Sequence, residues 1–344
     1  MTRLSMRFDL RVPPFAQTSF AEQHQAMLEM VTWADRVGVE TVTFSEHHGD
    51  PAGFTSAPLT LAAAVLARTQ RLRVSIAAAL VPLHDPIRLA EQLASIDCLA
   101  PGRLSVVLGA GYRRVEFEMA GVDVRERGPL LEECVRVFRC AWTGRPFEWR
   151  GREVLVTPTP GTPGGPEILV GGKTLAGARR AARLRCGFSP AVAKLDVIAA
   201  YFEECERIGF AAAHVGGCAS LAEFREQQGP DRPVAPGFLM LSNDPESTWK
   251  RIGRYAAYDA MTYAAWQEDG VVSDWVVPGA ETWEQLRDSG RYAVVTPQEC
   301  LALVARDGGL TLHPLMGGIE PGLAWQSLRL FEAEVLPHLA PAAP

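Results

Sequence analysis

Two repeating patterns of apolar and polar residues follow one another along most of the chain. Short segments rich in β-branched and apolar residues have the composition of strands. The segments after them place apolar residues three and four positions apart, as on one face of a helix. The first pair is a strand over residues 6–12 and a helix whose apolar face contains Met27, Met30, Val31 and Ala34. The pattern predicts a chain built from successive β-α units.

Seven further strands follow in the same way. They are predicted at 39–46, 72–81, 103–111, 167–172, 186–190, 234–241 and 309–318. The other helices are predicted at 58–68, 86–100, 131–142, 175–185, 192–208, 245–267 and 323–339. Strands that alternate with helices pair in parallel, and a chain of 344 residues favours a closed (β/α)8 TIM barrel, formed by a single domain over residues 1–344. A doubly wound sheet is the alternative fold.

Two stretches depart from the alternation. Residues 145–166 are rich in Pro and Gly, which predicts a short hairpin and an exposed loop. Residues 211–232 follow neither period, and we expect an insertion or irregular region there.

Composition and charge narrow the class of protein. With 47% hydrophobic and 22% charged residues, the chain is typical of a globular protein with a large core. A net charge of −6 and scattered Lys and Arg argue against nucleic acid as a partner. Residues 1–15 contain no signal-peptide core, and no apolar run is long enough to span a membrane, so we expect a cytoplasmic protein. The seven cysteines lack C-x-x-C spacing, which predicts reduced and mostly structural thiols.

Polar residues gather at the end of the second predicted strand, in "TVTFSEHHGDP" (41–51). Side chains alternate between the two faces of a strand. With Val42 and Phe44 toward the helices, His47 faces the barrel interior, and Glu46 and His48 face away. This parity, and the absence of H-E-x-x-H spacing, argue against a metal site. Barrel enzymes keep their chemistry at strand ends, so His47 is a candidate functional residue. A hydrogen-bonded histidine that closes the barrel is the alternative.

Small residues on the next two predicted strands leave room for a ligand. Ser75, Ala77 and Ala79 share one face of the third strand, which suits a flat ring system, although tight packing against a large neighbour also explains them. After the fourth strand, Gly109 and the second glycine of "LGAGYRR" allow a backbone to approach a ligand closely. Arg114 stands where a dinucleotide fingerprint has its third glycine, so a Rossmann site is not expected.

The segment "GGKT", residues 171–174, follows the fifth predicted strand. Glu167 replaces the first glycine of a P-loop, which argues against an NTPase. Two glycines before Thr174 at a helix N-terminus, with Lys173 adjacent, offer amides, a hydroxyl and a cation to a single phosphate group. A plain turn between a strand and a helix is the alternative.

Together these segments resemble the bacterial luciferase-like flavin-dependent monooxygenases. The resemblance is carried, in order and over nearly the whole chain, by "SEHH", "PLHDPIRLAEQ", "GRLSVVLGAGY", "ILVGGKTLAG" and "GGIEPGLAWQSL". It implies a (β/α)8 barrel that binds FMN at the carboxyl ends of its strands, usually as a homodimer. The implied reaction uses reduced FMN and O2 to oxygenate a small organic substrate.

The resemblance also implies roles for individual residues. His47 matches the family's active-site histidine, where it would hold or protonate the reacting oxygen species, and Ala77–Ala78 matches a non-prolyl cis peptide that lies against the flavin ring. The residues implied to line the cofactor are Gly109, Gly111 and Tyr112, and those implied to hold its phosphate are Gly171, Gly172, Lys173 and Thr174. Phe54, in the loop after "EHH", is expected to shape the substrate pocket, although packing alone also explains an aromatic residue there.

Departures from the family pattern leave alternatives open. Luciferase has a phosphate-binding cation where this chain has Ala110, and Lys173, a serine in many members, is expected to replace it. Without a dinucleotide fingerprint, a separate reductase is expected to supply the reduced flavin. The alternatives are a deazaflavin-dependent oxidoreductase on the same barrel, a non-catalytic flavin-binding protein and, least favoured, a metal-dependent hydrolase. Glu-His-His in place of the Asp-His of deazaflavin-dependent relatives favours FMN.

Overall fold

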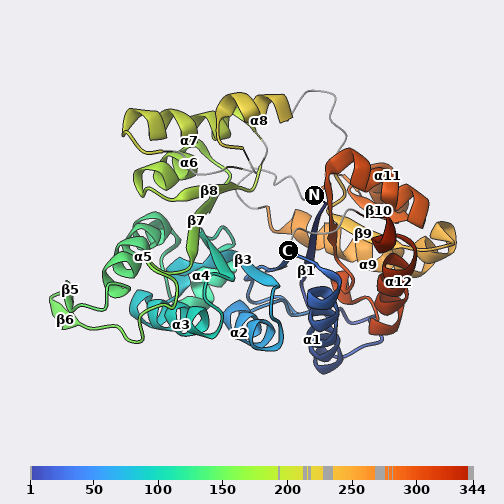
Figure 1. Ribbon diagram of the computed structural model, residues 1–344, viewed down its shortest axis with the longest axis horizontal. Coiled ribbons are helices and arrows are strands. Elements are labelled where there is room, and N and C mark those ends of the chain that lie inside the picture. The colour runs from blue at the N-terminus through green and yellow to red at the C-terminus, as the bar shows by residue number, and fades with distance from the viewer. Residues whose placement is uncertain are drawn as a thin grey trace.

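A parallel sheet forms the centre of the molecule. The structure, a computed structural model, describes residues 2–192, 194–211, 215, 218–227, 235–267, 276–277, 279–280 and 282–339. Seven strands pair in the order β11-β1-β2-β3-β4-β7-β8. They are β1 Arg3–Phe8, β2 Thr41–Phe44, β3 Arg73–Leu80, β4 Leu104–Gly109, β7 Glu167–Gly172, β8 Gly187–Pro190 and β11 Gly309–Leu312. The sheet curls like part of a barrel wall (Figure 1).

Two further strand pairs lie outside this sheet. Strands β9 Phe238–Leu241 and β10 Tyr292–Val295 pair in parallel with each other, and β9 contacts β11. Strands β5 Phe147–Trp149 and β6 Arg152–Val154 form the antiparallel hairpin predicted within residues 145–166. The α/β barrel class is thus confirmed, with β9 and β10 as a separate pair beside the β11 edge.

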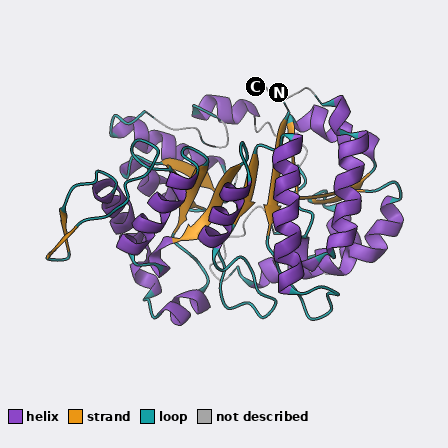
Figure 2. Ribbon diagram, turned by 60° about the horizontal axis from the view of Figure 1, so that its bottom comes forward, coloured by secondary structure: helices purple, strands orange, loops and turns teal. Residues whose placement is uncertain are grey.

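Helices follow the strands and cover the outer side of the sheet (Figure 2). They are α1 Phe20–Val37, α2 Pro58–Arg68, α3 Pro86–Leu99, α4 Arg114–Ala120, α5 Arg127–Ala141, α6 Leu175–Arg183, α7 Leu195–Arg207, α8 Leu221–Gln227, α9 Pro245–Ala265, α10 Trp283–Asp288, α11 Pro297–Asp307 and α12 Pro321–Glu334. The helix boundaries follow local chemistry. Ser19 and Glu22 form a capping box at the start of α1, and Asp85 accepts a hydrogen bond from the Arg88 amide at the start of α3.

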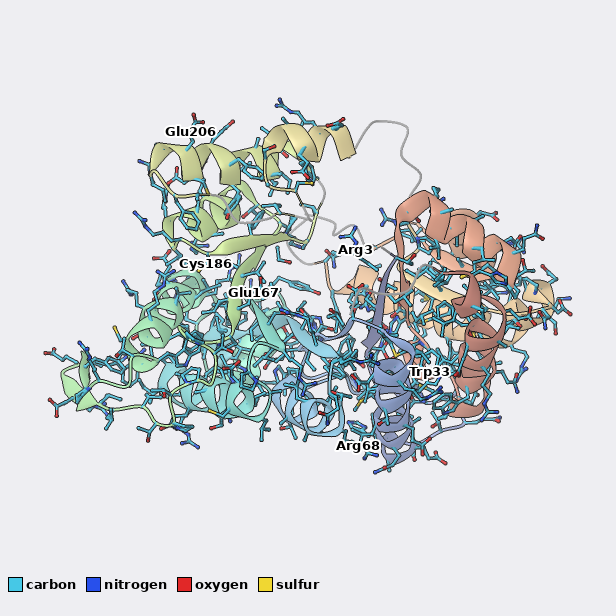
Figure 3. The ribbon with its side chains drawn as sticks, in the orientation of Figure 1. Arg3, Trp33, Arg68, Glu167, Cys186 and Glu206 are labelled. Atoms are coloured by element: carbon cyan, nitrogen blue, oxygen red, sulfur yellow. The ribbon has the colours of Figure 1, made fainter. Side chains whose placement is uncertain are left out.

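The core lies between the sheet and these helices. Val42 and Phe44 of β2 are fully buried, as are Val74 and Ile76 of β3, and each such side chain contributes about 1.5–3 kcal/mol by leaving water. Trp33 of α1, labelled in Figure 3, joins α1 to α12, since its indole N–H donates to Glu332 over 2.7 Å. All seven cysteines are free thiols, and five of them are buried.

Several predicted boundaries are wrong. Strand β1 covers residues 3–8 in place of 6–12, because the chain turns at Leu10 (φ 55°) and Arg11 forms an ion pair with Asp9. Strand β11 ends at Leu312, short of the predicted 318. Helix α8 lies inside the region 211–232 that was expected to be irregular, and the rest of that region lies largely outside the described residues. Helices α4, α10 and α11 and strand β10 were not predicted.

Candidate active site

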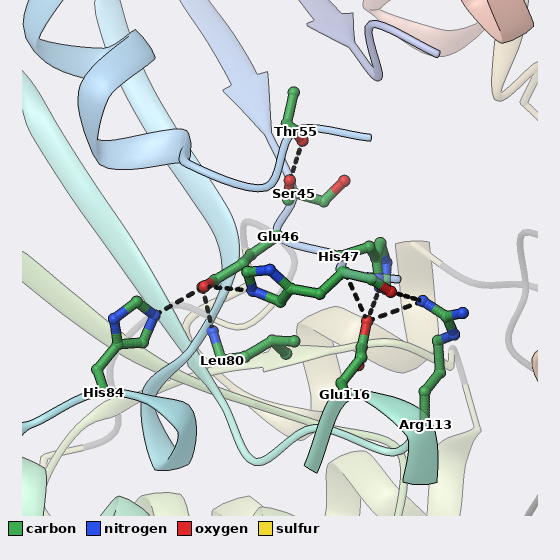
Figure 4. Close-up of polar contacts among 9 residues, drawn as sticks. Ser45, Glu46, His47, Thr55, Leu80, His84, Arg113 and Glu116 are labelled. Carbon is green, nitrogen blue, oxygen red and sulfur yellow. Dashed lines mark hydrogen bonds and ion pairs between the residues drawn. The ribbon is translucent and has the colours of Figure 1, made fainter. Parts of the chain in front are cut away.

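His47 lies just beyond the carboxyl end of β2, in a cluster of aromatic rings. The histidine is 7% exposed. Its ring centroid is 4.7 Å from that of Trp266, 4.8 Å from that of Phe54 and 6.3 Å from that of Tyr263. Phe54 reaches this position because the Thr55 hydroxyl donates to the carbonyl of Ser45 and so holds the loop against the strand end (Figure 4). Phe54 is therefore a buried neighbour of His47, and aromatic rings pack around the imidazole.

Glu116 of α4 binds the ring of His47. The carboxylate oxygen Oε1 lies 3.1 Å from His47 Nδ1, and the same oxygen accepts from the backbone amide of His48 over 3.1 Å (Figure 4). Arg113 donates to this oxygen over 3.0 Å and to the His48 carbonyl over 2.7 Å, while its guanidinium stacks 3.9 Å from the centroid of the Trp266 ring. A buried charge network therefore fixes the orientation of the imidazole.

The partner of Nδ1 determines the protonation of the ring. A carboxylate only accepts, so Nδ1 carries the proton and Nε2 of the neutral ring carries the lone pair. Burial lowers the pKa of His47, although the hydrogen bond and the charge of Glu116 act in the opposite direction. At neutral pH His47 is therefore a neutral imidazole, and its Nε2 makes no hydrogen bond to any described residue.

Glu46 lies on the opposite side of the strand end from His47, as parity predicts. It is 1% exposed, and its carboxylate accepts from His84 Nε2 over 2.7 Å, from His48 Nε2 over 3.0 Å and from the Leu80 amide over 2.6 Å. Although burial raises the pKa of Glu46, these hydrogen bonds and the charge of His84 lower it to about 2. The bond to Glu46 in turn raises the pKa of His48. Glu46 thus anchors the end of β2 to the end of β3.

The predicted flavin-facing segment of β3 has an unusual backbone. The Ala77–Ala78 peptide bond is cis, as the resemblance implies, and the register between β3 and β4 shifts at this point. The carbonyl of Ala78 accepts from the Glu46 amide over 3.1 Å. A Cβ added at Gly109 would lie 2.9 Å from the Cβ of Ala78, so only glycine allows this approach of the two strands.

The turn after β4 brings α4 to the site. Gly111 has φ +74°, and a Cβ there would lie 2.8 Å from the ring of Phe117, so glycine lets α4 pack against the turn. Helix α4 then presents Glu116 on the face next to Phe117, where both residues are buried. The ring of Tyr112, in the same turn, lies 6.1 Å from that of His47.

The "GGKT" segment spans the end of β7 and the start of α6. Thr174 is the N-cap of α6 and its hydroxyl oxygen accepts from the Gly177 amide over 3.1 Å, which leaves its O–H proton available to a ligand. Lys173 Nζ lies 5.0 Å from the centroid of the Tyr112 ring. A Cβ added at Gly171 would lie 3.0 Å from Val107, so close packing against Val107 explains why residue 171 is a glycine. The ammonium group of Lys173 thus lies at the turn that contains Ala110 and Tyr112.

Sequence reasoning missed four residues of this site. Glu116 belongs to helix α4, which was not predicted, and Arg113 is the N-cap of this helix. Tyr263 and Trp266 were not singled out, because aromatic residues at helical spacing usually belong to the core. In the sequence, a carboxylate beside Phe117 in an otherwise amphipathic segment is a weak sign of a buried functional residue. Within the described residues, no group of three or more His, Cys, Asp or Glu side chains is arranged to hold a metal ion. No described helix has the length and hydropathy needed to cross a membrane.

The fold and this strand-end site define a barrel-type α/β protein. The model of the luciferase-like monooxygenase family matches residues 6–295. The chain belongs to that family.

Individual relatives are distant. The alkanal monooxygenase alpha chain of Photorhabdus luminescens is 28% identical over 163 residues, which are 46% of this chain and 44% of that protein. Two further curated relatives are likewise covered over only 38% and 44% of their own length.

Two solved structures show the same fold over nearly the whole chain. The oxygenating constituent of 3,6-diketocamphane monooxygenase from the CAM plasmid of Pseudomonas putida, in complex with FMN, has a TM-score of 0.68 at 20% identity and covers 99% of this chain and 100% of its own. An F420-dependent secondary alcohol dehydrogenase, in complex with an F420-acetone adduct, has a TM-score of 0.64 at 16% identity and covers 99% of both chains.

Proposed function

We propose that the protein is an FMN-dependent monooxygenase that oxygenates a small organic substrate. The observation that carries the proposal is the neutral His47, held by Glu116 at the same strand-end region as the cis Ala77–Ala78 bond and Gly109. Membership of the luciferase-like monooxygenase family supports the reaction class, and the FMN complex of the diketocamphane enzyme supports the cofactor by analogy.

The residues present fit FMN. Ala77 and Ala78 present backbone and methyl groups, which suit the face of a flat ring, and a side chain at Gly109 would collide with Ala78 and disturb this surface. Lys173 and the positive end of α6, capped by Thr174, suit a terminal phosphate. When bound and reduced, FMN supplies the electrons that activate O2.

The side chains around His47 perform three tasks in this proposal. The lone pair on His47 Nε2 accepts a proton from the reacting oxygen or substrate and later returns it, while Glu116 stabilises the imidazolium form and fixes the tautomer. Trp266 and Phe54 exclude water from the imidazole. Arg113 offsets the charge of Glu116, so that the buried carboxylate is compatible with a neutral histidine.

Titration of the protein with FMN and, separately, with deazaflavin F420 tests the cofactor. We expect a shift of the visible absorbance band with FMN and none with F420. Oxygen consumption in the presence of reduced FMN, compared between the wild-type protein and His47→Asn, tests catalysis. Binding of F420 alone would identify a deazaflavin-dependent oxidoreductase, and FMN binding with oxygen consumption no faster than that of free reduced FMN would identify a flavin-binding protein.

Two partners belong to the proposal. Helix α4, which follows Gly109 and Gly111, has only seven residues and begins at Arg114, so this turn does not resemble a dinucleotide site and supports a separate reductase as the source of reduced FMN. A homodimer is proposed by analogy with the family. Slow oxidation of NADH by the protein alone, and rapid oxidation with an added FMN reductase, would support a separate reductase. Light scattering measures whether the protein is a homodimer.

A further inference from the structure

A small polar cavity adjoins the aromatic cluster around His47. Its walls include Arg7 of β1, His313 just beyond β11, Arg291 just before β10 and Tyr263 of α9. Tyr263 borders the cavity and also lies 6.3 Å from the ring of His47, so one side chain belongs to both. The cavity volume is about 20 Å³, room for one water-sized group and too little for a whole substrate.

Two carboxylates, that of Asp259 in the cavity wall and that of Asp9, lie near these groups. The buried guanidinium of Arg11 bridges the carboxylates of Asp9 and Asp259. Asp9 also accepts from the Gly317 amide over 3.0 Å, and Asp259 accepts from the Tyr292 hydroxyl over 2.5 Å. Arg11 balances only one of these two carboxylates. With Arg7 and Arg291 included, three cations face two anions, so this region keeps a formal charge of +1.

The remaining groups suit an anion. The guanidinium of Arg291 makes no hydrogen bond or ion pair with any described residue, and Arg7 donates to the Tyr263 hydroxyl over 3.4 Å. The imidazole of His313 is 2% exposed. Its Nε2 lies 3.7 Å from Asp9 Oδ2, beyond hydrogen-bond distance, and lacks a hydrogen-bond partner among the described residues. Burial, with the charges of Arg7 and Arg11, lowers the pKa of His313 to about 3, so the ring is neutral and can donate one hydrogen bond. Guanidinium groups and an imidazole N–H are the donors that recognise oxyanions.

We propose that this cavity binds the carboxylate of a small organic acid, and that such an acid is the substrate of the enzyme. The evidence for carboxylate binding is the cavity itself, whereas the role of the bound acid as the substrate of oxygenation rests on the proposed function. The small volume favours a planar carboxylate over a tetrahedral sulfonate or phosphate. With the carboxylate between Arg291 and His313, the rest of the acid extends past Tyr263 toward His47.

Calorimetric titration of the cofactor-free protein with hexanoate tests the site. Hexanol and hexylamine, which have the same chain and no negative charge, and hexanesulfonate serve as comparison ligands. We expect hexanoate to bind at least tenfold more tightly than these three. Equal binding of hexanoate and hexanol, or tighter binding of hexanesulfonate, would overturn the carboxylate site.

Substitutions of residues in the cavity wall show where hexanoate binds. Arg291→Met is expected to weaken hexanoate binding at least tenfold and Arg291→Lys less than fivefold. His313→Phe is expected to weaken it about tenfold, and circular dichroism shows whether either variant is folded. Arg287→Met, on exposed α10, is the control and should bind as the wild type does. Wild-type affinity in both Arg291→Met and His313→Phe would place hexanoate elsewhere and refute the site.

The two proposals can fail independently. Hexanoate binding needs no flavin, so a protein that binds hexanoate but not FMN keeps the carboxylate site and loses the monooxygenase function. A protein that oxidises reduced FMN but shows no preference for hexanoate keeps the function and loses the site.

Discussion

His47 Nδ1 and Glu116 Oε1 lie 3.1 Å apart, although the two residues are 69 positions apart in the chain. The pair joins the end of β2 to α4, and α4 packs against the glycine turn that ends β4. The element that lines the proposed cofactor site therefore also sets the tautomer and the pKa of the proposed catalytic histidine. The proposed cofactor site and the proposed proton acceptor are therefore held in place by the same helix and turn.

Replacing Glu116 by glutamine is expected to slow catalysis and to shift its pH dependence. The variant loses the charge that raises the pKa of His47, so this pKa falls further. If Nε2 must be unprotonated, activity is lost as the pH falls through the pKa of His47, and this acidic limb moves to lower pH in the variant. Oxygen consumption with reduced FMN, measured across pH, should also fall about 10- to 100-fold at the optimum.

Glu118→Gln on the exposed side of α4 is the control for this experiment. It should retain the wild-type rate and pH profile. A Glu116→Gln enzyme that matches Glu118→Gln in both respects would show that the carboxylate does not act through His47.

Replacing Gly109 by alanine is expected to abolish tight FMN binding. The new Cβ would lie 2.9 Å from that of Ala78 and push apart the strands on which the flavin ring is proposed to rest. Spectral titration should show at least a tenfold weaker affinity, with a loss of about 1–3 kcal/mol in the free energy of unfolding. Gly322→Ala, where the added Cβ meets no atom within 4 Å, is the matched control. An unchanged FMN affinity in Gly109→Ala would show that the flavin ring does not bind at this position.

Glu46 is expected to stabilise the protein in a pH-dependent way. Its pKa is about 2 in the folded protein and 4.5 as an ordinary glutamate, a difference worth about 3 kcal/mol at neutral pH. Because the folded pKa is depressed, this stability is present above about pH 4.5 and is lost as the pH falls toward 2. Urea denaturation of Glu46→Gln should show a loss of about 2–4 kcal/mol at neutral pH that shrinks on acidification.

Glu153→Gln on exposed β6 controls for the removal of one negative charge. A Glu46→Gln deficit that stayed constant down to low pH would mean that packing, and not the charge of Glu46, accounts for the stability.

Replacing Lys173 by alanine separates binding of the phosphate from binding of the ring. We expect FMN affinity to fall about tenfold, the size of one charge-assisted hydrogen bond, while the affinity for riboflavin, which lacks the phosphate, stays the same. Lys250→Ala, at an exposed position of α9, should bind both ligands as the wild type does. An unchanged FMN affinity in Lys173→Ala would disprove the role of Lys173 as the missing cation.

The pattern of residues within a single strand predicted those features of the site that depend on one strand alone. The parity of β2 separated His47 from Glu46, and the small residues of β3 marked the segment that contains the cis peptide bond. The partner of His47 could not be found in this way, because Glu116 reaches it only through the packing of α4 on Gly111. Strand periodicity says nothing about such contacts between distant segments.

Helical periodicity has the same limit at α9. Tyr263 and Trp266 have the spacing of core residues, and their place beside His47 depends on where α9 lies across the strand ends. Strand β10 was also missed. Its residues, 292–295, follow soon after helix α10, which was not predicted either.

A crystal structure of the protein soaked with FMN is the decisive test of the proposed cofactor site. We expect the flavin ring to lie in van der Waals contact with Ala77–Ala78 and Gly109, on the side that faces His47, with the phosphate at Lys173 and Thr174. A ring bound elsewhere, or no bound FMN at concentrations that saturate other members of the family, would contradict it.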